Sequence, residues 1–386
     1  MGVGELPGPL AGYRILDLTQ VVSGPLATML LADQGADVIK VEPVAIGDIT
    51  RLGRFASNGI TSVFANLNRG KRSAAVDLAS DEGRAAFLGL CRGADVVVEN
   101  FRPGAMGRLG LGYDEVRAVN PEIVYVSISG FGDDGPYAAR PVLDPVMQGL
   151  TGIISRQVNP ELPFPDLVRQ LVADKATALT VAQAITAALL VRARGGGGQR
   201  VTVPMLDSTL YFFWPDGMMD HTWLGDNVTP GTPLSDIYSL TRTADGQLVY
   251  FALTDAHFLG LYRALGHPEW CDDERFTFAG RSDPRNLSAL GALIADAFEQ
   301  LPTGEVLARM YAEGVPCGPI RALEDVHLDE QVVHNRALVE WEHPVGGRLR
   351  QPRPGARFSG TPVEPRYSVP AHGEHTRELL EGPRPS

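Results

Sequence analysis

The segment from Tyr13 to Pro43 most constrains the fold of this chain, because it reads as a strand, a helix and a second strand in succession. An apolar strand over 13–18 is followed by a Gly-Pro turn, an apolar helix that closes at Gly35, and a strand over 38–42. This pattern predicts a βαβ unit. Such units bind nucleotide-like ligands at the carboxyl ends of their strands. The segment lacks G-x-G-x-x-G and G-x-x-x-x-G-K-[ST], so neither an ordinary dinucleotide site nor a P-loop is expected.

The same alternation continues through the first half of the chain. Further strands are predicted at 73–78, 94–99, 123–128 and 200–203, and helices at about 80–92 and 172–194. The pattern is typical of an α/β fold, and we expect a Rossmann-like large domain with a mostly parallel sheet. The run Gly195–Gly198 follows a helix instead of opening one, so it is interpreted as a helix stop and not as a phosphate loop.

The pattern changes near residue 226, after a turn-rich connector. A hairpin is predicted from strands at 237–241 and 248–253, followed by helices at about 256–265, 286–300 and 303–313. These elements predict a smaller α+β domain. The expected organisation is a large domain over 1–225, a small domain over 226–340, and a C-terminal segment over 341–386 that returns to the large domain.

Composition and charge narrow the classes of partner. The chain has 386 residues and a formal net charge of −12, which disfavours nucleic acid and anionic membrane surfaces. No apolar run is expected to span a bilayer. The three cysteines are far apart and form no disulfide framework, so a reducing cytoplasm is the expected location.

The positions of the histidines restrict the chemistry. All eight lie at position 221 or later. Ser-His or Cys-His catalysis and a histidine-rich metal site are therefore excluded within the α/β half. Chemistry in that half must use carboxylates, hydroxyls or lysines, and no metal ligands are predicted.

Several ordered blocks of sequence resemble the class III CoA-transferases of the CaiB/BaiF type, which include formyl-CoA transferases and 2-methylacyl-CoA racemases. The blocks are Ser23–Pro25 with Gly35–Pro43, Gly47–Arg51, Asn68–Ser73, Asp95–Gly104, Ser129–Tyr137, Ala173–Asp174, Gly314–Pro319 and Arg357–Pro362. Each block is weak by itself, but their order and spacing are specific. The resemblance implies acyl-CoA and a small carboxylic acid as substrates, no permanently bound cofactor, and an interlocked homodimer.

The resemblance makes Asp174 the candidate nucleophile. It implies that this carboxylate attacks the acyl-CoA thioester to form a mixed anhydride and CoA thiolate, that the thiolate then attacks the enzyme-bound acyl group, and that an acceptor carboxylate finally takes the CoA. Asp174 falls in the first turn of the helix expected at 172–194, where the helix dipole favours its ionised form. Asp144 is expected to support the site by hydrogen bonding or orientation, with a simple turn role as the alternative.

Position 143 distinguishes between two activities of the family. The racemases place a histidine immediately before the acid that corresponds to Asp144, whereas this chain has Leu143. Because leucine cannot exchange a proton, the sequence argues against a racemase that works through this pair. A racemase with another second base, and an acyl-CoA-binding protein without transfer activity, remain the alternative hypotheses.

The CoA-binding residues are also expectations from the resemblance. They are Val22 and Ser23 beside the pantetheine path, Arg51, Lys71 and Arg72 as basic residues near the phosphates, and Asn100, Phe101 and Arg108 as further CoA contacts. Two positions depart from the family pattern, since Pro43 and Ala79 stand where some transferases carry basic residues. The adenosine end of CoA is therefore expected to be held in a different way. The flexible glycine lid of formyl-CoA transferases has no counterpart in this sequence, since Gly195–Gly198 is not in its position, so formyl-CoA is disfavoured as the donor.

Overall fold

The computed structural model describes residues 8–157, 163–363 and 366–381. The chain divides into two compact units, and the larger one combines Met1–Thr222 with Val333–Ser386. The smaller unit is the continuous segment Trp223–Val332. Each unit has its own hydrophobic core, so the two are described separately below.

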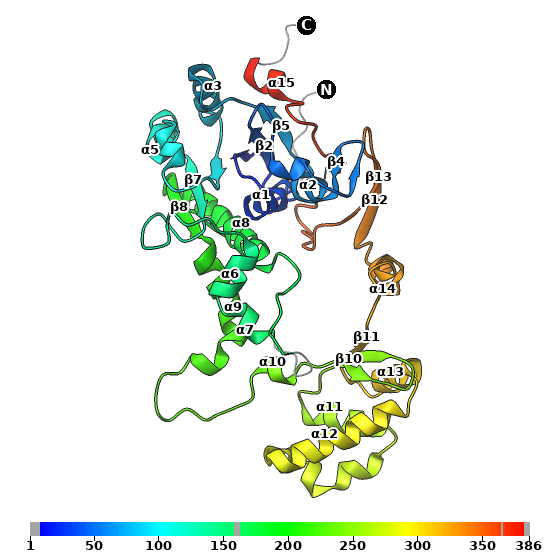
Figure 1. Cartoon of the computed structure of the whole chain (residues 1–386). Coiled ribbons are helices and arrows are strands. Elements are labelled where there is room, and N and C mark those ends of the chain that lie inside the picture. The colour runs from blue at the N-terminus through cyan, green and yellow to red at the C-terminus, as the bar shows by residue number, and fades with distance from the viewer. Residues whose placement is uncertain (1–7, 158–162, 364–365, 382–386) are drawn as a thin grey trace. The chain divides into compact units, whose positions relative to one another are not determined.

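A six-stranded sheet of parallel strands, in the order β5-β2-β1-β6-β7-β8, forms the centre of the larger unit (Figure 1). Its strands are β1 (Arg14–Asp17), β2 (Asp37–Glu42), β5 (Arg72–Ala75), β6 (Val96–Glu99), β7 (Val124–Ser129) and β8 (Gln199–Pro204). The opening βαβ unit is confirmed, because β1 pairs with β2 in parallel across helix α1 (Ser23–Ala32). The strand order reverses between β1 and β6, which makes this the topological switch point of the sheet.

Helices cover both faces of the sheet, as alternate strand residues show. Ile15 belongs to one core cluster with apolar residues of α1 and α8 (Val172–Ala193). Its neighbour Leu16 belongs to a second cluster with residues of α3 (Asp81–Cys91) and α5 (Tyr113–Val119). Because successive residues of a strand point to opposite faces, the sheet is buried on both sides, as parallel sheets are.

Helix α8 corrects one expectation from the sequence. An 18-residue window of this 22-residue helix has a mean hydropathy of 1.5, so by length and composition it could cross a membrane, and the prediction that no run is long enough was wrong. Here Ala178, Val181 and Ile185 of α8 pack in the core between the sheet and α1, so this is a core helix. It ends at Ala193, and Gly195 follows with φ of +83°, which confirms the predicted helix stop.

The C-terminal segment lies along β5, the edge strand of the sheet. The backbone N–H of His375 donates to the carbonyl of Ser73 at 2.8 Å, and the N–H of Ala75 donates to Oγ1 of Thr376 at 2.8 Å. Helix α15 (Thr376–Glu381) follows these contacts. The segment thereby occupies backbone groups that an edge strand otherwise leaves open.

The smaller unit contains a three-stranded antiparallel sheet and helices α11 (Asp255–Ala264), α12 (Pro284–Glu299) and α13 (Thr303–Ala312). The sheet order is β11-β10-β9, with β9 at Thr241–Arg242, β10 at Gln247–Tyr250 and β11 at Cys317–Pro319. The strand predicted at 237–241 was largely wrong. Pro233 caps a short helix there, α10 (Leu234–Ile237), and pairing with β10 begins only at Thr241.

Shorter elements complete the description. They are α2 (Ser62–Asn68), α4 (Ala105–Arg108), α6 (Asp144–Leu150), α7 (Ile153–Arg156), α9 (Met205–Gly217), α14 (Glu330–His334), β3 (Ala56–Ser57), β4 (Ile60–Thr61), β12 (Leu338–His343) and β13 (Gly347–Pro352).

Candidate active site

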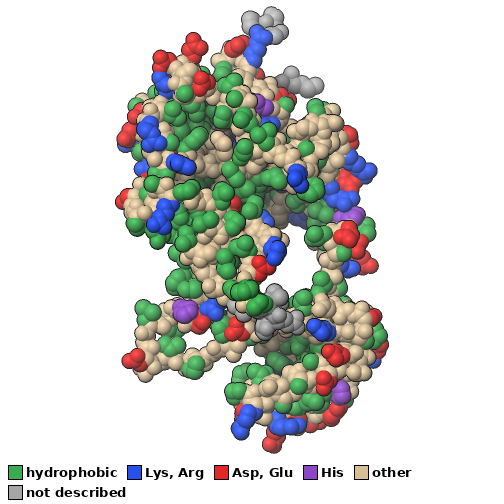
Figure 2. Space-filling model, viewed as in Figure 1, with side chains coloured by type: hydrophobic (Ala, Val, Ile, Leu, Met, Phe, Trp, Pro, Cys, Tyr) green, Lys and Arg blue, Asp and Glu red, His purple; other side chains and the backbone are tan. Residues whose placement is uncertain are grey.

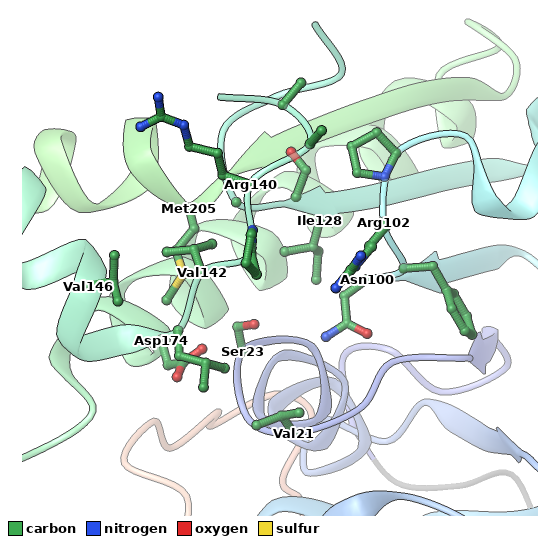
Figure 3. Close-up of a pocket in the computed structure, with 18 residues that line it drawn as sticks. Val21, Ser23, Asn100, Arg102, Ile128, Arg140, Val142, Val146, Asp174 and Met205 are labelled. Carbon is green, nitrogen blue, oxygen red and sulfur yellow. The ribbon is translucent and has the colours of Figure 1, made fainter. Parts of the chain in front are cut away.

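A pocket of about 480 Å³ opens at the carboxyl ends of the strands, at the switch point between β1 and β6. Its wall combines the turn after β1, the loop after β6, the end of β7 and the start of α9. Residues of the 138–146 segment and Asp174 of α8 complete it. Figure 3 shows Asp174 beside Ser23 at one end, with Asn100 and Arg102 farther along the pocket. This is the place where open α/β sheets bind ligands.

Asp174 lies in the first turn of α8, as predicted, and its side chain reaches the pocket. It is only 8% exposed. Burial, followed by the nearby charge of Asp144, raises the pKa of Asp174 to about 6, while hydrogen bonds from the hydroxyl and backbone N–H of Ser23 act in the opposite direction. The carboxylate is therefore ionised at neutral pH but is more basic than an ordinary aspartate, which suits a nucleophile.

Asp144 is the first residue of α6 and hydrogen-bonds to the backbone of Asp174. Its Oδ2 accepts the backbone N–H of Asp174 at 3.0 Å, and its Oδ1 accepts Nε2 of Gln148 at 2.6 Å. Gln148 in turn accepts the N–H of Val168 at 3.0 Å. Asp144 is 2% exposed and does not line the pocket that Asp174 faces. The geometry thus fits an orienting role better than direct contact with a substrate.

Leu143 lines the same pocket as Asp174 and is 62% exposed. Its side chain has no group that exchanges a proton. Among the described lining residues, Asp174 is the only carboxylate, and no histidine or lysine lines the pocket. The described lining residues therefore offer one carboxylate as a proton acceptor, which does not suit a two-base reaction.

Three of the predicted CoA residues gather at this pocket, namely Ser23, Asn100 and Phe101. Asn100 also holds the turn after β1, because its Oδ1 accepts the N–H of Gln20 at 2.9 Å and its Nδ2 donates to the carbonyl of Gln20 at 2.8 Å. The contact of Val22 with CoA stays a prediction. Its side chain is buried, and Val21 lines the pocket in its place.

Lys71 is not available to a phosphate in this structure. Its Nζ donates to Oδ2 of Asp17 at 2.8 Å, to the carbonyl of Pro25 at 2.9 Å and to Oδ1 of Asn68 at 2.8 Å. These bonds use all three donors of the ammonium group. The side chain is fully buried, and desolvation lowers the pKa of Lys71 to about 8 although Asp17 opposes the shift. Lys71 therefore belongs to the internal framework of the sheet.

The other predicted basic residues also lie outside the Asp174 pocket. Arg51 forms a two-pronged ion pair with Glu42, at 2.8 and 2.7 Å, and Arg72 bonds to Asp37 and Glu378. Both residues line a separate cavity of about 810 Å³ near the C-terminal segment. Arg108 is exposed at the end of α4, shortly after the loop that carries Asn100 and Phe101. Its contact with CoA remains a prediction.

Two pocket arginines, Arg102 and Arg140, were missed by the sequence reasoning. Both are exposed, and neither forms an ion pair with a described carboxylate. Arg140 instead lies over the ring of Tyr137, with 3.7 Å between Cζ and the ring centroid. Arg102 directly follows two predicted CoA residues, so its position in the motif could have identified it. Arg140 lies just beyond the block that ends at Tyr137.

Comparison with known proteins agrees with this geometry. A family model described as CoA-transferase family III matches residues 10–376. The chain belongs to CoA-transferase family III. This family III CoA-transferase is 34% identical to succinyl-CoA:glutarate CoA-transferase of Mus musculus, over 97% of the chain and 86% of that protein. It is also 34% identical to formyl-CoA:oxalate CoA-transferase of Streptomyces coelicolor, over 97% of the chain and 94% of that protein.

Solved structures give the same assignment. The crystal structure of Rv3272 from Mycobacterium tuberculosis matches with a TM-score of 0.82 at 32% identity, covering 97% of this chain and 100% of that one. A CaiB/BaiF family protein from Brucella suis matches with a TM-score of 0.80 at 32% identity, over 97% and 98% of the two chains. The resemblance inferred from the motifs is thereby confirmed. Within the described part of this transferase, no group of three or more His, Cys, Asp or Glu side chains is arranged to hold a metal ion.

Proposed function

We propose that this transferase moves CoA from an acyl-CoA donor to a carboxylic acid acceptor through an acyl anhydride on Asp174. The observation that carries the proposal is the position of Asp174, which is a buried carboxylate facing a switch-point pocket of about 480 Å³. An ionised carboxylate is a weak nucleophile in water. Desolvation and a raised pKa increase its reactivity toward a thioester carbonyl.

The exchange balances in four steps. An oxygen of Asp174 attacks the carbonyl carbon of the donor thioester, and the C–S bond breaks. CoA thiolate departs, and Asp174 and the donor acyl group form a mixed anhydride. The thiolate attacks the aspartyl carbonyl of this anhydride and releases the donor acid. The acceptor carboxylate then attacks the aspartyl thioester to give a second anhydride and free thiolate. Finally the thiolate attacks the acceptor acyl carbon, which yields the new acyl-CoA and restores Asp174.

The turn before α1 supports these steps. Ser23 hydrogen-bonds to Asp174 through its hydroxyl and backbone N–H, so it keeps the carboxylate oriented along the pocket. The same donors can stabilise negative charge that develops on an attacked carbonyl oxygen. Arg102 and Arg140, which also line the pocket, provide positive charge for the phosphates of CoA. Phe101 offers an aromatic face for the adenine ring.

The test uses Asp174→Ala and Asp174→Asn with wild type as reference. Succinyl-CoA and acetyl-CoA serve as donors in a mass-spectrometric screen of carboxylic acid acceptors. Wild-type enzyme should form new acyl-CoA species, and both variants should lose this activity by several orders of magnitude. Hydroxylamine added together with a donor should inactivate wild-type enzyme and leave a hydroxamate on the Asp174 peptide. Full activity of Asp174→Ala would refute the proposal.

We also propose that the functional state is an interlocked homodimer. In support, the larger unit carries many exposed hydrophobic side chains, visible as green atoms on the face shown in Figure 2. On α9 these include Tyr211, which is 81% exposed, and Phe212, which is 53% exposed. Such residues favour a surface that another chain covers. A monomer at micromolar concentration in size-exclusion chromatography with light scattering would contradict the proposal.

A further inference from the structure

The turn between β1 and α1 has a strained backbone at Val21. This residue has φ of +71°, a conformation that is costly for a β-branched residue. The turn carries two residues that matter for the pocket, since Val21 lines it and Ser23 hydrogen-bonds to Asp174. Surrounding groups must hold such a conformation, because an unrestrained valine would leave it.

A buried ion pair between Lys40 and Asp48, outside the pocket, contacts the backbone of this turn. Nζ of Lys40 donates to the carbonyl of Thr19 at 2.8 Å and lies 2.9 Å from Oδ2 of Asp48. The other oxygen of Asp48, Oδ1, accepts the N–H of Val21 at 3.3 Å. Both charged side chains are 0% exposed. The pair therefore contacts the backbone on both sides of Gln20.

Asp48 is itself fixed in place. Its Oδ1 accepts the backbone N–H of Thr50 at 2.9 Å and the hydroxyl of Thr50 at 2.8 Å. Its own N–H donates to Oε2 of Glu42 at 2.9 Å. Oδ2 accepts no hydrogen bond from any other described group, so Lys40 is its one compensating partner there. A fixed acceptor of this kind can restrain the amide of Val21.

Stability alone does not account for this pair. Apolar side chains of similar volume often stabilise a core as well as a buried ion pair does, or better. The pair does provide two directional contacts to a strained turn, which apolar side chains could not supply. Neither Lys40 nor Asp48 lines the pocket, so neither is placed to contact a substrate.

We propose that Lys40 and Asp48 are positioning residues that hold the turn in the strained form in which Ser23 meets Asp174. This inference rests on the proposed role of Asp174 as the nucleophile. When the restraint is lost, Val21 relaxes, Ser23 moves away, and the carboxylate of Asp174 loses its two hydrogen bonds. The attack on the thioester then slows, whereas the contacts of Arg102 and Arg140 with CoA are retained.

The pH profile separates positioning from a general loss of structure. Two groups act on Asp174, namely Asp144 from α6, whose charge raises its pKa, and Ser23 from α1, whose hydrogen bonds lower it. Loss of the Ser23 contacts raises the pKa of Asp174 further. The acid limb of kcat should therefore move to higher pH.

The experiment compares Asp48→Ala and Asp48→Asn with the control Asp33→Asn in the full-length enzyme. Asp33 forms another buried ion pair, with Arg69, and both of those side chains are 4% exposed. It lies just after α1, at the opposite end of that helix from the turn. Asp48→Ala should lower kcat about tenfold or more, change KM for acyl-CoA less than threefold, and shift the acid limb. Asp33→Asn should lower thermal stability and leave kcat and its pH profile unchanged.

A second variant tests the strain directly. Glycine adopts positive φ without a steric cost, so Asp48→Ala should reduce kcat less in a Val21→Gly background than in wild type. If Asp48→Ala does not fold, kcat and its pH profile are measured for Asp48→Asn and for the Asp48→Ala/Val21→Gly double variant instead. Folded Asp48 variants with wild-type kcat and pH profile, or effects equal to those of Asp33→Asn, would overturn the inference. Asp174→Ala tests the nucleophile separately, so the two proposals can fail independently.

Discussion

The carboxylate of Asp144 accepts the backbone N–H of Asp174 at 3.0 Å, so one acidic residue holds another at the start of a helix. The contact fixes the backbone of Asp174 and also places a negative charge near its side chain. That charge is the second-largest cause of the raised pKa of Asp174, after burial. The two effects oppose each other in function. The hydrogen bond orients Asp174 for attack on the thioester, whereas repulsion between the two carboxylates favours the protonated, unreactive form of Asp174.

Asp144→Asn should separate these two effects. Asparagine keeps an oxygen that can accept the N–H of Asp174 but removes the charge, so the pKa of Asp174 should fall. The acid limb of kcat should move to lower pH with a change in maximal rate of less than about tenfold. Asp144→Leu removes the acceptor as well and should lose more activity. The measurement is kcat against pH for both variants, and an unchanged acid limb in Asp144→Asn would contradict the assignment.

Activity should depend on ionisation of Asp174 itself. With its pKa at about 6, the carboxylate is charged above this pH and becomes protonated below it. Since only the ionised form attacks, kcat should fall about tenfold for each pH unit below about 6. Initial rates in buffers of constant ionic strength provide the measurement. A rate that stays constant down to pH 4 would show that Asp174 does not have this pKa or does not act as the nucleophile.

Arg102 and Arg140 should govern the affinity for acyl-CoA. Truncating a charge-assisted hydrogen bond costs about 1.5–3 kcal/mol, which corresponds to roughly 10- to 150-fold in affinity. Arg102→Ala and Arg140→Ala should therefore raise KM for acyl-CoA with little change in kcat. The matched control is Arg348→Ala, which removes an exposed arginine on β13, away from the pocket. Equal KM values for all three variants would exclude the two pocket arginines as phosphate ligands.

Leu143 predicts that the enzyme does not exchange the proton at C2 of an acyl-CoA. In deuterium oxide without an acceptor acid, a 2-methylacyl-CoA should show no deuterium at C2 by mass spectrometry. The physical reason is that, among the described lining residues, Asp174 is the only carboxylate and Leu143 has no group that exchanges a proton. Wash-in at a rate comparable to CoA transfer would support the racemase alternative and would require a second base that the described pocket residues do not supply.

Glu42 should contribute to resistance against acid. Its burial raises the pKa, but the hydrogen bonds and charge of Arg51 outweigh this and lower the pKa of Glu42 from 4.5 to about 2. A carboxyl group with a depressed pKa stabilises the fold above its unfolded value and loses that contribution as pH falls to the folded value. The stabilisation, about 3 kcal/mol, should therefore disappear between pH 4.5 and 2.

Urea unfolding at several pH values tests this prediction. Glu42→Gln should lose stability at neutral pH and should show a weaker pH dependence between pH 4.5 and 2 than wild type. Asp81→Asn is a suitable control, since the side chain of Asp81 is 95% exposed. If both variants follow the wild-type pH dependence, the Glu42–Arg51 pair does not have the assigned effect.

The sequence was informative about the sheet because each strand is a short apolar run that ends at a turn signal. The parallel strands from β1 to β8 lie within a few residues of their predicted positions. The predicted strand at 237–241 failed because β-propensity alone does not reveal a proline-capped helical turn at Pro233. Helix α8 was predicted, but its length and composition suit a membrane span as well as a buried core helix, and the expectation that no run could span a bilayer overlooked this.

The site residues Ser23, Asn100 and Asp174 were expected from the resemblance of the motifs and not from strand or helix periodicity. In the structure all three line one pocket. The charged residues were harder, because a lysine motif does not show whether its ammonium faces a ligand or an internal carboxylate. Lys71 is satisfied by Asp17, which is distant in sequence, and only the three-dimensional pairing reveals this contact. Arg140 was overlooked because it lies just beyond the motif that ends at Tyr137, and only the structure places it at the pocket.

The contacts between the C-terminal segment and β5 have a consequence for biosynthesis. The backbone of Ser73 and Ala75 is covered by His375 and Thr376, which are made about 300 residues later. Until those residues leave the ribosome, the nascent sheet has one exposed edge that can pair with another chain. Premature termination shortly before His375 would leave every residue of the Asp174 pocket in place and still yield a protein prone to aggregation.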